Sequence, residues 1–143
     1  MRKHLLALAT MILAGAAAAP ALAGEQTACP VSGEAIDKAS SPHVDWQGQR
    51  IYFCCNKCPA KFKADPEKYF AKFAEAGVEL KNIQTTCPVS GETLGEGDMG
   101  APVAQAYKGR TVMFCCNMCV GKFDKDPAKY LAKLPGEQPA PAK

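Results

Sequence analysis

The sequence predicts an α+β fold of two small modules in tandem. Three observations support this prediction: one block of sequence occurs twice, each copy contains a β-hairpin pattern followed by helix signals, and each copy spans only about 50 residues. The chain has 143 residues, of which 48% are hydrophobic and 22% are charged, as in folded proteins. Its formal charge of +3 is too small to indicate a nucleic acid or a membrane surface as partner.

Residues 1–23 are predicted to be a cleaved signal peptide. A basic start is followed by the uncharged apolar run Leu5–Ala19 and by Ala21-Leu22-Ala23, a small-x-small cleavage pattern before Gly24. A retained membrane anchor is the alternative for this run, and no later stretch is long and apolar enough to span a bilayer. We therefore expect a periplasmic or secreted protein with no membrane insertion after cleavage. Such a compartment permits disulfides, so the cysteines need not be free thiols.

The mature chain contains one unit twice. Three blocks recur in the same order: C-P-V-S-G-E from Cys29 and Cys87, F-C-C-N-x-C from Phe53 and Phe114, and K-F-x-x-D-P-x-K-Y from Lys61 and Lys122. The repeat divides the mature chain into module 1 at 24–76, a linker at 77–84, module 2 at 85–134 and a Pro/Ala-rich tail at 135–143 that we expect to be disordered.

Each module is expected to begin with a turn at C-P-V-S-G and to continue into a hairpin. The hairpins should turn at Gln47-Gly48 and at Lys108-Gly109, because the flanking residues alternate around an x-Gly pair. A short helix should follow the double cysteine in each module and should include Phe62 or Phe123.

A second helix is expected in each module. Asp65-Pro66 and Asp126-Pro127 fit a helix N-cap followed by proline at the first helical position. The first of these helices should end near Ala76, before Gly77, and its counterpart near Leu134.

The cysteines are the candidate metal ligands. Each module has four of them, one in the first turn and three within the sequence C-C-x-x-C: Cys29, Cys54, Cys55 and Cys58, then Cys87, Cys115, Cys116 and Cys119. Modules of this size bury too little apolar surface to fold comfortably without further stabilisation. Thiolates favour soft or borderline ions, so we predict Cu(I) or Zn(II) as the bound metal.

Three other roles for the cysteines are less consistent with the sequence. Structural disulfides fit the even number of cysteines and the compartment, but three of four cysteines within five residues is unusual for such a framework. A C-x-x-C redox couple lacks the βαβ context of a thioredoxin fold. Covalent haem attachment is excluded, because Pro59 and Val120 occupy the required histidine position.

The motifs C-P-V-S-G, Y-F-C-C-N-K-C and K-F-K-A-D-P-E-K-Y resemble those of the YHS domain, a member of the TRASH-like group of heavy-metal-binding modules. The resemblance covers Cys29 to about Phe73 and, in the second repeat, Cys87 to about Leu131. It implies a treble-clef-like unit of turn, hairpin and helix. In module 2, Met113 replaces the family's aromatic residue, which is Tyr52 in module 1.

The family pattern of one early cysteine followed by C-x3-C carries over to three cysteines in each module: Cys29, Cys54 and Cys58, and Cys87, Cys115 and Cys119. Related ribosomal zinc modules have a second cysteine in the first turn, where this chain has Ser32 and Ser90. A fourth ligand is therefore missing from the pattern. Cys55 and Cys116 could supply it or bind a second ion, and which of the adjacent cysteines faces the metal stays open.

Other ligands are less favoured. His43 has no counterpart in module 2, where Ala104 stands, and the thioethers of Met99, Met113 and Met118 suit Cu(I) but more often fill gaps in a core. The sequence has no catalytic triad, no carboxylate pair with a partner base and no phosphate loop, so we expect no enzyme.

We predict an exported heavy-metal-binding protein that uses cysteine thiolates for metal buffering, delivery or resistance. Copper is the first expectation for the metal and zinc the second. Expected partners are metal ions and an envelope metal transporter or metalloenzyme. The alternative is a metal-free, disulfide-stapled interaction module of the cell envelope.

Overall fold

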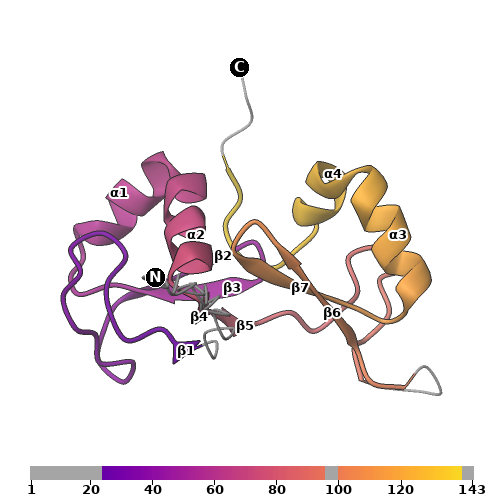
Figure 1. The fold of residues 1–143 in the computed structure, drawn as a ribbon, viewed down its shortest axis with the longest axis horizontal. Coiled ribbons are helices and arrows are strands. Elements are labelled where there is room, and N and C mark those ends of the chain that lie inside the picture. The colour runs from indigo at the N-terminus through magenta and orange to yellow at the C-terminus, as the bar shows by residue number, and fades with distance from the viewer. Residues whose placement is uncertain (1–23, 96–99, 140–143) are drawn as a thin grey trace, which may run out of the picture.

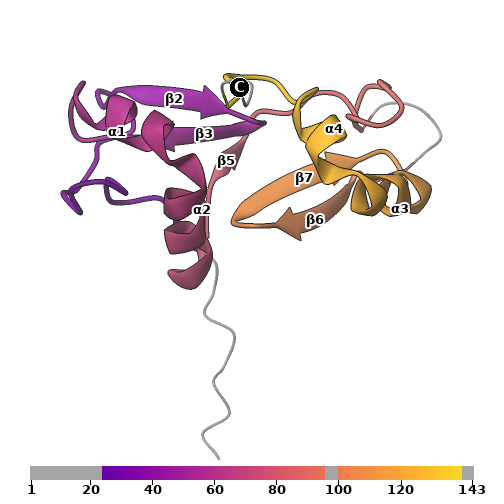
Figure 2. The same ribbon diagram turned by 90° about the horizontal axis from the view of Figure 1, so that it is seen from above.

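The computed structural model describes residues 24–95 and 100–139, which form two modules lying side by side (Figures 1 and 2). Each module contains an antiparallel hairpin followed by two helices, which confirms the α+β prediction. The predicted signal peptide and Met99 lie outside the described residues. Within the described ranges, no helix is both long and apolar enough to cross a bilayer.

The hairpins occupy the predicted positions. β2 (His43–Trp46) pairs with β3 (Gln49–Tyr52), and β6 (Val103–Tyr107) pairs with β7 (Arg110–Phe114). The φ angles are 43° and 81° at Gln47-Gly48, and 46° and 75° at Lys108-Gly109. Positive φ at both central residues defines a type I′ turn, whose twist matches that of the flanking strands.

The helices follow the double cysteines and the Asp-Pro pairs. They are α1 (Cys58–Ala64) and α2 (Pro66–Glu75) in module 1, and α3 (Asn117–Lys125) and α4 (Pro127–Leu131) in module 2. The predicted caps are confirmed, because the Asp65 and Asp126 carboxylates accept hydrogen bonds from the backbone N–H of Lys68 and Lys129.

The second helix of module 2 is shorter than expected. α4 ends at Leu131, and the next residues form tighter turns, in which the Leu134 N–H donates to the Leu131 carbonyl oxygen at 3.1 Å. The tighter turns bring Leu134, which is buried, against Gly48 of the module 1 hairpin. The end of this helix therefore coincides with a contact between Leu134 and the other module.

The expected linker takes part in the sheets of module 1. β4 (Val78–Glu79) pairs in parallel with β1 (Gly24–Glu25), and β5 (Lys81–Asn82) adds to the β2–β3 hairpin as a third strand. Short strand pairs of this kind have no hydrophobic alternation long enough to predict them from sequence.

The first part of the expected disordered tail, residues 135–139, is ordered in the structure. The Glu137 N–H donates to the Asp45 carbonyl oxygen at 2.7 Å, and the Gln47 N–H donates to the Glu137 carbonyl oxygen at 3.2 Å. The Glu137 carboxylate also pairs with Lys63 at 2.7 Å. Backbone hydrogen bonds and one ion pair therefore fasten this segment of the tail along the edge of β2.

Each module has its own apolar core. Phe62 is fully buried in module 1, and Phe123, its counterpart in the repeat, is fully buried in module 2. The Trp46 ring meets Phe62 edge-on, with 5.6 Å between the ring centroids. The aromatic residues in the repeated blocks therefore form the centre of each core.

The hairpin tips of the two modules point toward their junction. The Gln49 and Asn82 side-chain amides both donate to the Thr111 carbonyl oxygen, at 2.8 and 2.6 Å. The far ends of β3 and β7 lead into the double cysteines. The two groups of cysteines therefore lie at opposite ends of the molecule, with the junction between them (Figure 1).

Candidate metal centres

The first cysteine of each module lies in a closed turn. In module 1 the Cys29 N–H donates to the Glu34 carbonyl oxygen and the Gly33 N–H donates to the Cys29 carbonyl oxygen, both at 2.8 Å. Gly33 has a φ of 80°, a conformation that side chains other than glycine's rarely adopt. The turn at Cys87 repeats the same two hydrogen bonds at the same lengths.

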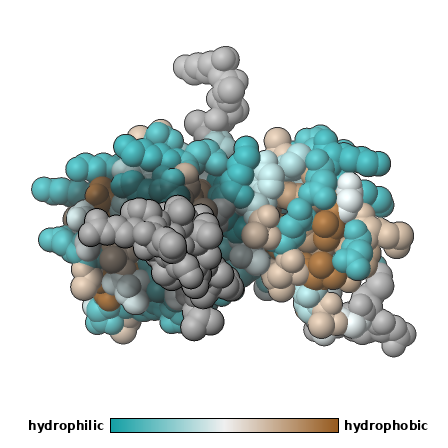
Figure 3. All heavy atoms as spheres, viewed as in Figure 1, coloured by the Kyte–Doolittle hydropathy of each residue, from teal (hydrophilic) through white to brown (hydrophobic). Residues whose placement is uncertain are grey.

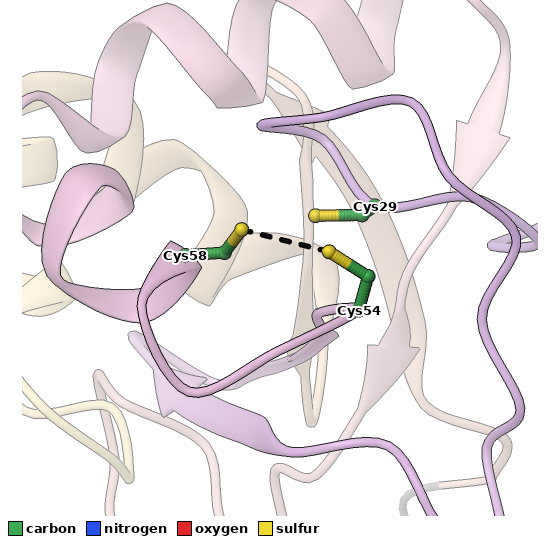
Figure 4. A group of neighbouring side chains, drawn as sticks. All are labelled: Cys29, Cys54 and Cys58. Carbon is green, nitrogen blue, oxygen red and sulfur yellow. Dashed lines mark hydrogen bonds between the residues drawn. The ribbon is translucent and has the colours of Figure 1, made fainter.

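Three sulfurs converge in each module. The atoms of each group all lie within 4.8 Å of one another: Cys29, Cys54 and Cys58 in module 1 (Figure 4), and Cys87, Cys115 and Cys119 in module 2. These are the cysteines that the family resemblance implied. The first comes from the closed turn, the second follows the hairpin, and the third lies at the start of the next helix.

The spacing of the sulfurs suits a metal ion. Cys54 and Cys58 have their sulfurs 3.6 Å apart, and so do Cys115 and Cys119. For a metal–sulfur bond of about 2.3 Å, two ligand sulfurs lie about 4.0 Å apart in a trigonal site and about 3.8 Å apart in a tetrahedral one. All eight cysteines are free thiols in the structure.

The serines at the place of the missing fourth ligand contact the second cysteine of each group. Ser32 Oγ lies 3.1 Å from Cys54 Sγ, and Ser90 Oγ lies 3.3 Å from Cys115 Sγ. From the family pattern these serines represent only a lost ligand, and their contact with the cysteine thiols was not predicted. Their presence at the same place in both repeats was the available signal.

The first cysteine of each module ionises easily. Burial alone would raise the pKa of Cys29, but backbone N–H groups of Cys54 and Ser32 donate to its sulfur and lower the pKa to about 7. Burial likewise opposes ionisation of Cys87, but the hydroxyl and N–H of Ser90 lower the pKa of this thiol to about 7. Each module therefore holds one buried sulfur that is readily available as a thiolate.

The third cysteine of each module has a raised pKa and therefore resists ionisation. Burial raises the pKa of Cys58 and of Cys119, and the neighbouring thiols raise it further. A bound cation reverses this preference, because it stabilises the thiolate form of every ligand around it.

The adjacent cysteines Cys55 and Cys116 lie beside these groups, closer to solvent. Cys55 is exposed, with its sulfur 3.6 Å from Cys58 Sγ. Cys116 is half-buried, with its sulfur 3.7 Å from Cys119 Sγ and 3.9 Å from Cys115 Sγ. Neither belongs to the group of three that includes the first cysteine of its module.

The remaining candidate ligands lie elsewhere. His43 is an exposed residue of β2 whose ring lies 5.7 Å from that of Tyr52. Met113 lines a cavity of about 810 Å³ between the modules, whose lining includes no cysteine. Met118 precedes Cys119 and is 77% exposed. In Figure 3 the upper part of module 1 is mostly hydrophilic, whereas hydrophilic and hydrophobic residues are mixed over module 2.

Comparison with known families agrees with this geometry. Residues 28–72 match the YHS domain, which covers most of module 1, so the chain contains a YHS domain. The equivalent group of three cysteines in module 2 indicates a second metal-binding module in tandem with the first. No curated protein and no solved structure matches the chain.

Proposed function

We propose that this chain, a YHS domain followed by a second module of the same kind, is an exported metal-binding protein without enzymatic activity. Each module binds one heavy-metal ion through its group of three cysteine thiolates. Cu(I) is the first candidate for this ion, and Zn(II) is the second. The role is metal buffering, delivery or resistance in the cell envelope, with a metal transporter or metalloenzyme as partner.

The observation that carries this proposal is the convergence of three sulfurs in each module. Both groups consist of cysteines alone, with no imidazole or carboxylate among their members in the described residues. An all-sulfur donor set selects soft ions such as Cu(I) over the hard cations that prefer oxygen ligands.

The number of sulfurs in each group supports copper over zinc. Structural zinc sites are almost always tetrahedral with four protein ligands. Each group here has three cysteines. Where related zinc modules have a fourth cysteine ligand, this chain has a serine whose hydroxyl is hydrogen-bonded to one of the thiols. A three-sulfur site suits Cu(I), while Zn(II) would have to recruit Cys55 or Cys116 to complete its coordination.

Elemental analysis and native mass spectrometry of the full chain, purified anaerobically, test the proposal. We expect two copper or zinc ions per chain, and eight titratable thiols after the metal is removed with a chelator. Protein that holds no metal, contains almost no free thiols and takes up neither ion after reduction would instead be the disulfide-stapled module. That result would overturn the proposal.

A further inference from the structure

In module 2 the four cysteine sulfurs form two triangles that share an edge. In module 2 the inner triangle consists of Cys87, Cys115 and Cys119. The outer triangle consists of Cys115, Cys116 and Cys119, with sulfur–sulfur distances of 3.9, 3.7 and 3.6 Å. The shared edge is the pair Cys115–Cys119. Both triangles therefore have the dimensions of a three-sulfur metal site.

The two triangles differ in their access to solvent. Cys87 belongs only to the inner triangle and is 1% exposed. Cys116 belongs only to the outer triangle and is half-buried. Module 1 repeats the contrast, since Cys29 is 2% exposed and Cys55 is exposed, with Cys55 Sγ 3.6 Å from the shared Cys58. An ion that arrives from outside meets the outer triangle first.

From this geometry we infer that Cys55 and Cys116 are exchange ligands, through which the ion enters and leaves the buried three-cysteine site. This inference rests on the proposed function and assigns these two cysteines a role different from that of the other six. In module 2 the ion binds first to Cys115, Cys116 and Cys119. It then crosses the shared edge to the inner triangle.

The crossing is a ligand substitution without electron transfer. The metal–sulfur bond to Cys116 breaks, a metal–sulfur bond to Cys87 forms, and the bonds to Cys115 and Cys119 persist. Any proton displaced from the Cys87 thiol is taken up by the released Cys116 thiolate or by water. With metal–sulfur bonds of about 2.3 Å, the ion moves by roughly 2 Å, so the shared ligands need only small adjustments.

A further sulfur ligand for an incoming Cu(I) ion lies beside the outer triangle. In module 2 the residue before Cys119 is Met118, whose side chain is 77% exposed, and its thioether is a neutral donor for Cu(I). The cysteine groups of the two modules lie at opposite ends of the molecule (Figure 1). Each module therefore exchanges its ion with an external donor or acceptor and not with the other module.

Stopped-flow transfer of Cu(I) from its bicinchoninate complex to the full chain tests the inference. The test variant is C55S/C116S, and the matched control is C29S/C87S, which removes one sulfur per module from the inner triangle instead. We expect C55S/C116S to bind two ions per chain with wild-type affinity but to take them up at least about tenfold more slowly, equivalent to about 1.4 kcal/mol in the barrier. The control should lose affinity at equilibrium.

Three results would overturn part or all of this scheme, and they are distinguishable. Reduced stoichiometry or affinity in C55S/C116S would make Cys55 and Cys116 resident ligands. A wild-type transfer rate in that variant would show that the ion enters by another route. In both cases the proposed function stands. A wild-type chain that takes up neither Cu(I) nor Zn(II) would remove the proposed function and this inference together.

Discussion

Arg110 of β7 lies over the ring of Phe70 in α2, with 3.8 Å between the guanidinium carbon and the ring centroid. Arg110 is only 2% exposed, and its guanidinium also pairs with the Glu67 carboxylate of the same helix. A strand of module 2 is thus joined to a helix of module 1 by a buried cation. This contact fixes the junction between the modules and lies far from both groups of cysteines.

Replacing Arg110 should therefore loosen the junction without affecting metal binding. We expect Arg110→Ala to lower the free energy of unfolding by about 2–3 kcal/mol, because a desolvated cation–π contact and charge-assisted hydrogen bonds are lost. Urea unfolding measures this change, and elemental analysis should still find two ions per chain. Arg50→Ala, which removes a more exposed arginine from its ion pair with Asp45, is the control and should cost less. Equal losses in the two variants would contradict the assigned role of Arg110.

The two hairpin glycines provide a matched pair that tests the close approach of the modules. Gly48 and Gly109 both have positive φ, at 81° and 75°, so alanine adds a backbone strain of about 1–2 kcal/mol at either position. A Cβ on Gly48 would make an ordinary contact with Leu134 at 3.6 Å, whereas one on Gly109 would lie 2.0 Å from the Phe70 carbonyl oxygen. We expect Gly109→Ala to be clearly more destabilising than Gly48→Ala in urea unfolding. The reverse order would mean that the hairpin tip does not contact α2.

The pKa of Cys87 depends on Ser90, which gives a prediction about pH. Burial opposes ionisation of Cys87, but the Ser90 hydroxyl and N–H lower its pKa to about 7. Ser90→Ala should raise this pKa, which titration of thiolate absorbance near 240 nm in metal-free protein would detect. Because folding lowers the pKa, ionised Cys87 stabilises the metal-free fold above the usual thiol pKa, and this stabilisation is lost as the pH falls through about 7. An unchanged titration in Ser90→Ala would show that the hydroxyl does not contribute.

The separation of the two sites predicts that each can be removed without the other. We expect Cys58→Ala and Cys119→Ala each to reduce the metal content from two ions per chain to one, as measured by native mass spectrometry. The remaining site should keep its affinity, because the groups lie at opposite ends of the molecule. Lys57→Ala, an exposed change next to Cys58, is the control and should bind two ions. Loss of both ions from either cysteine variant would indicate one shared site.

The local elements of this protein could be predicted because their signals are local. The Asp65 and Asp126 caps, the type I′ turns at Gln47-Gly48 and Lys108-Gly109, and the helices after the double cysteines all follow from residue preferences within a few positions. The early termination of α4 and the ordered start of the tail could not be predicted in this way. Both depend on contacts between segments far apart in the chain, such as Leu134 against Gly48 and Glu137 against Asp45.

For the metal centres, the residues alone show that there are two matched sets of four cysteines and which three of each set fit the pattern of a metal-binding family. The difference between the adjacent cysteines depends on the folded chain: Cys54 and Cys115 lie close to the first cysteine of their module, while Cys55 and Cys116 lie on the solvent side. The reason is geometric. Neighbouring residues at the end of a strand can point in different directions, and only the path of the chain from β3 into α1, and from β7 into α3, fixes which sulfur meets the buried turn.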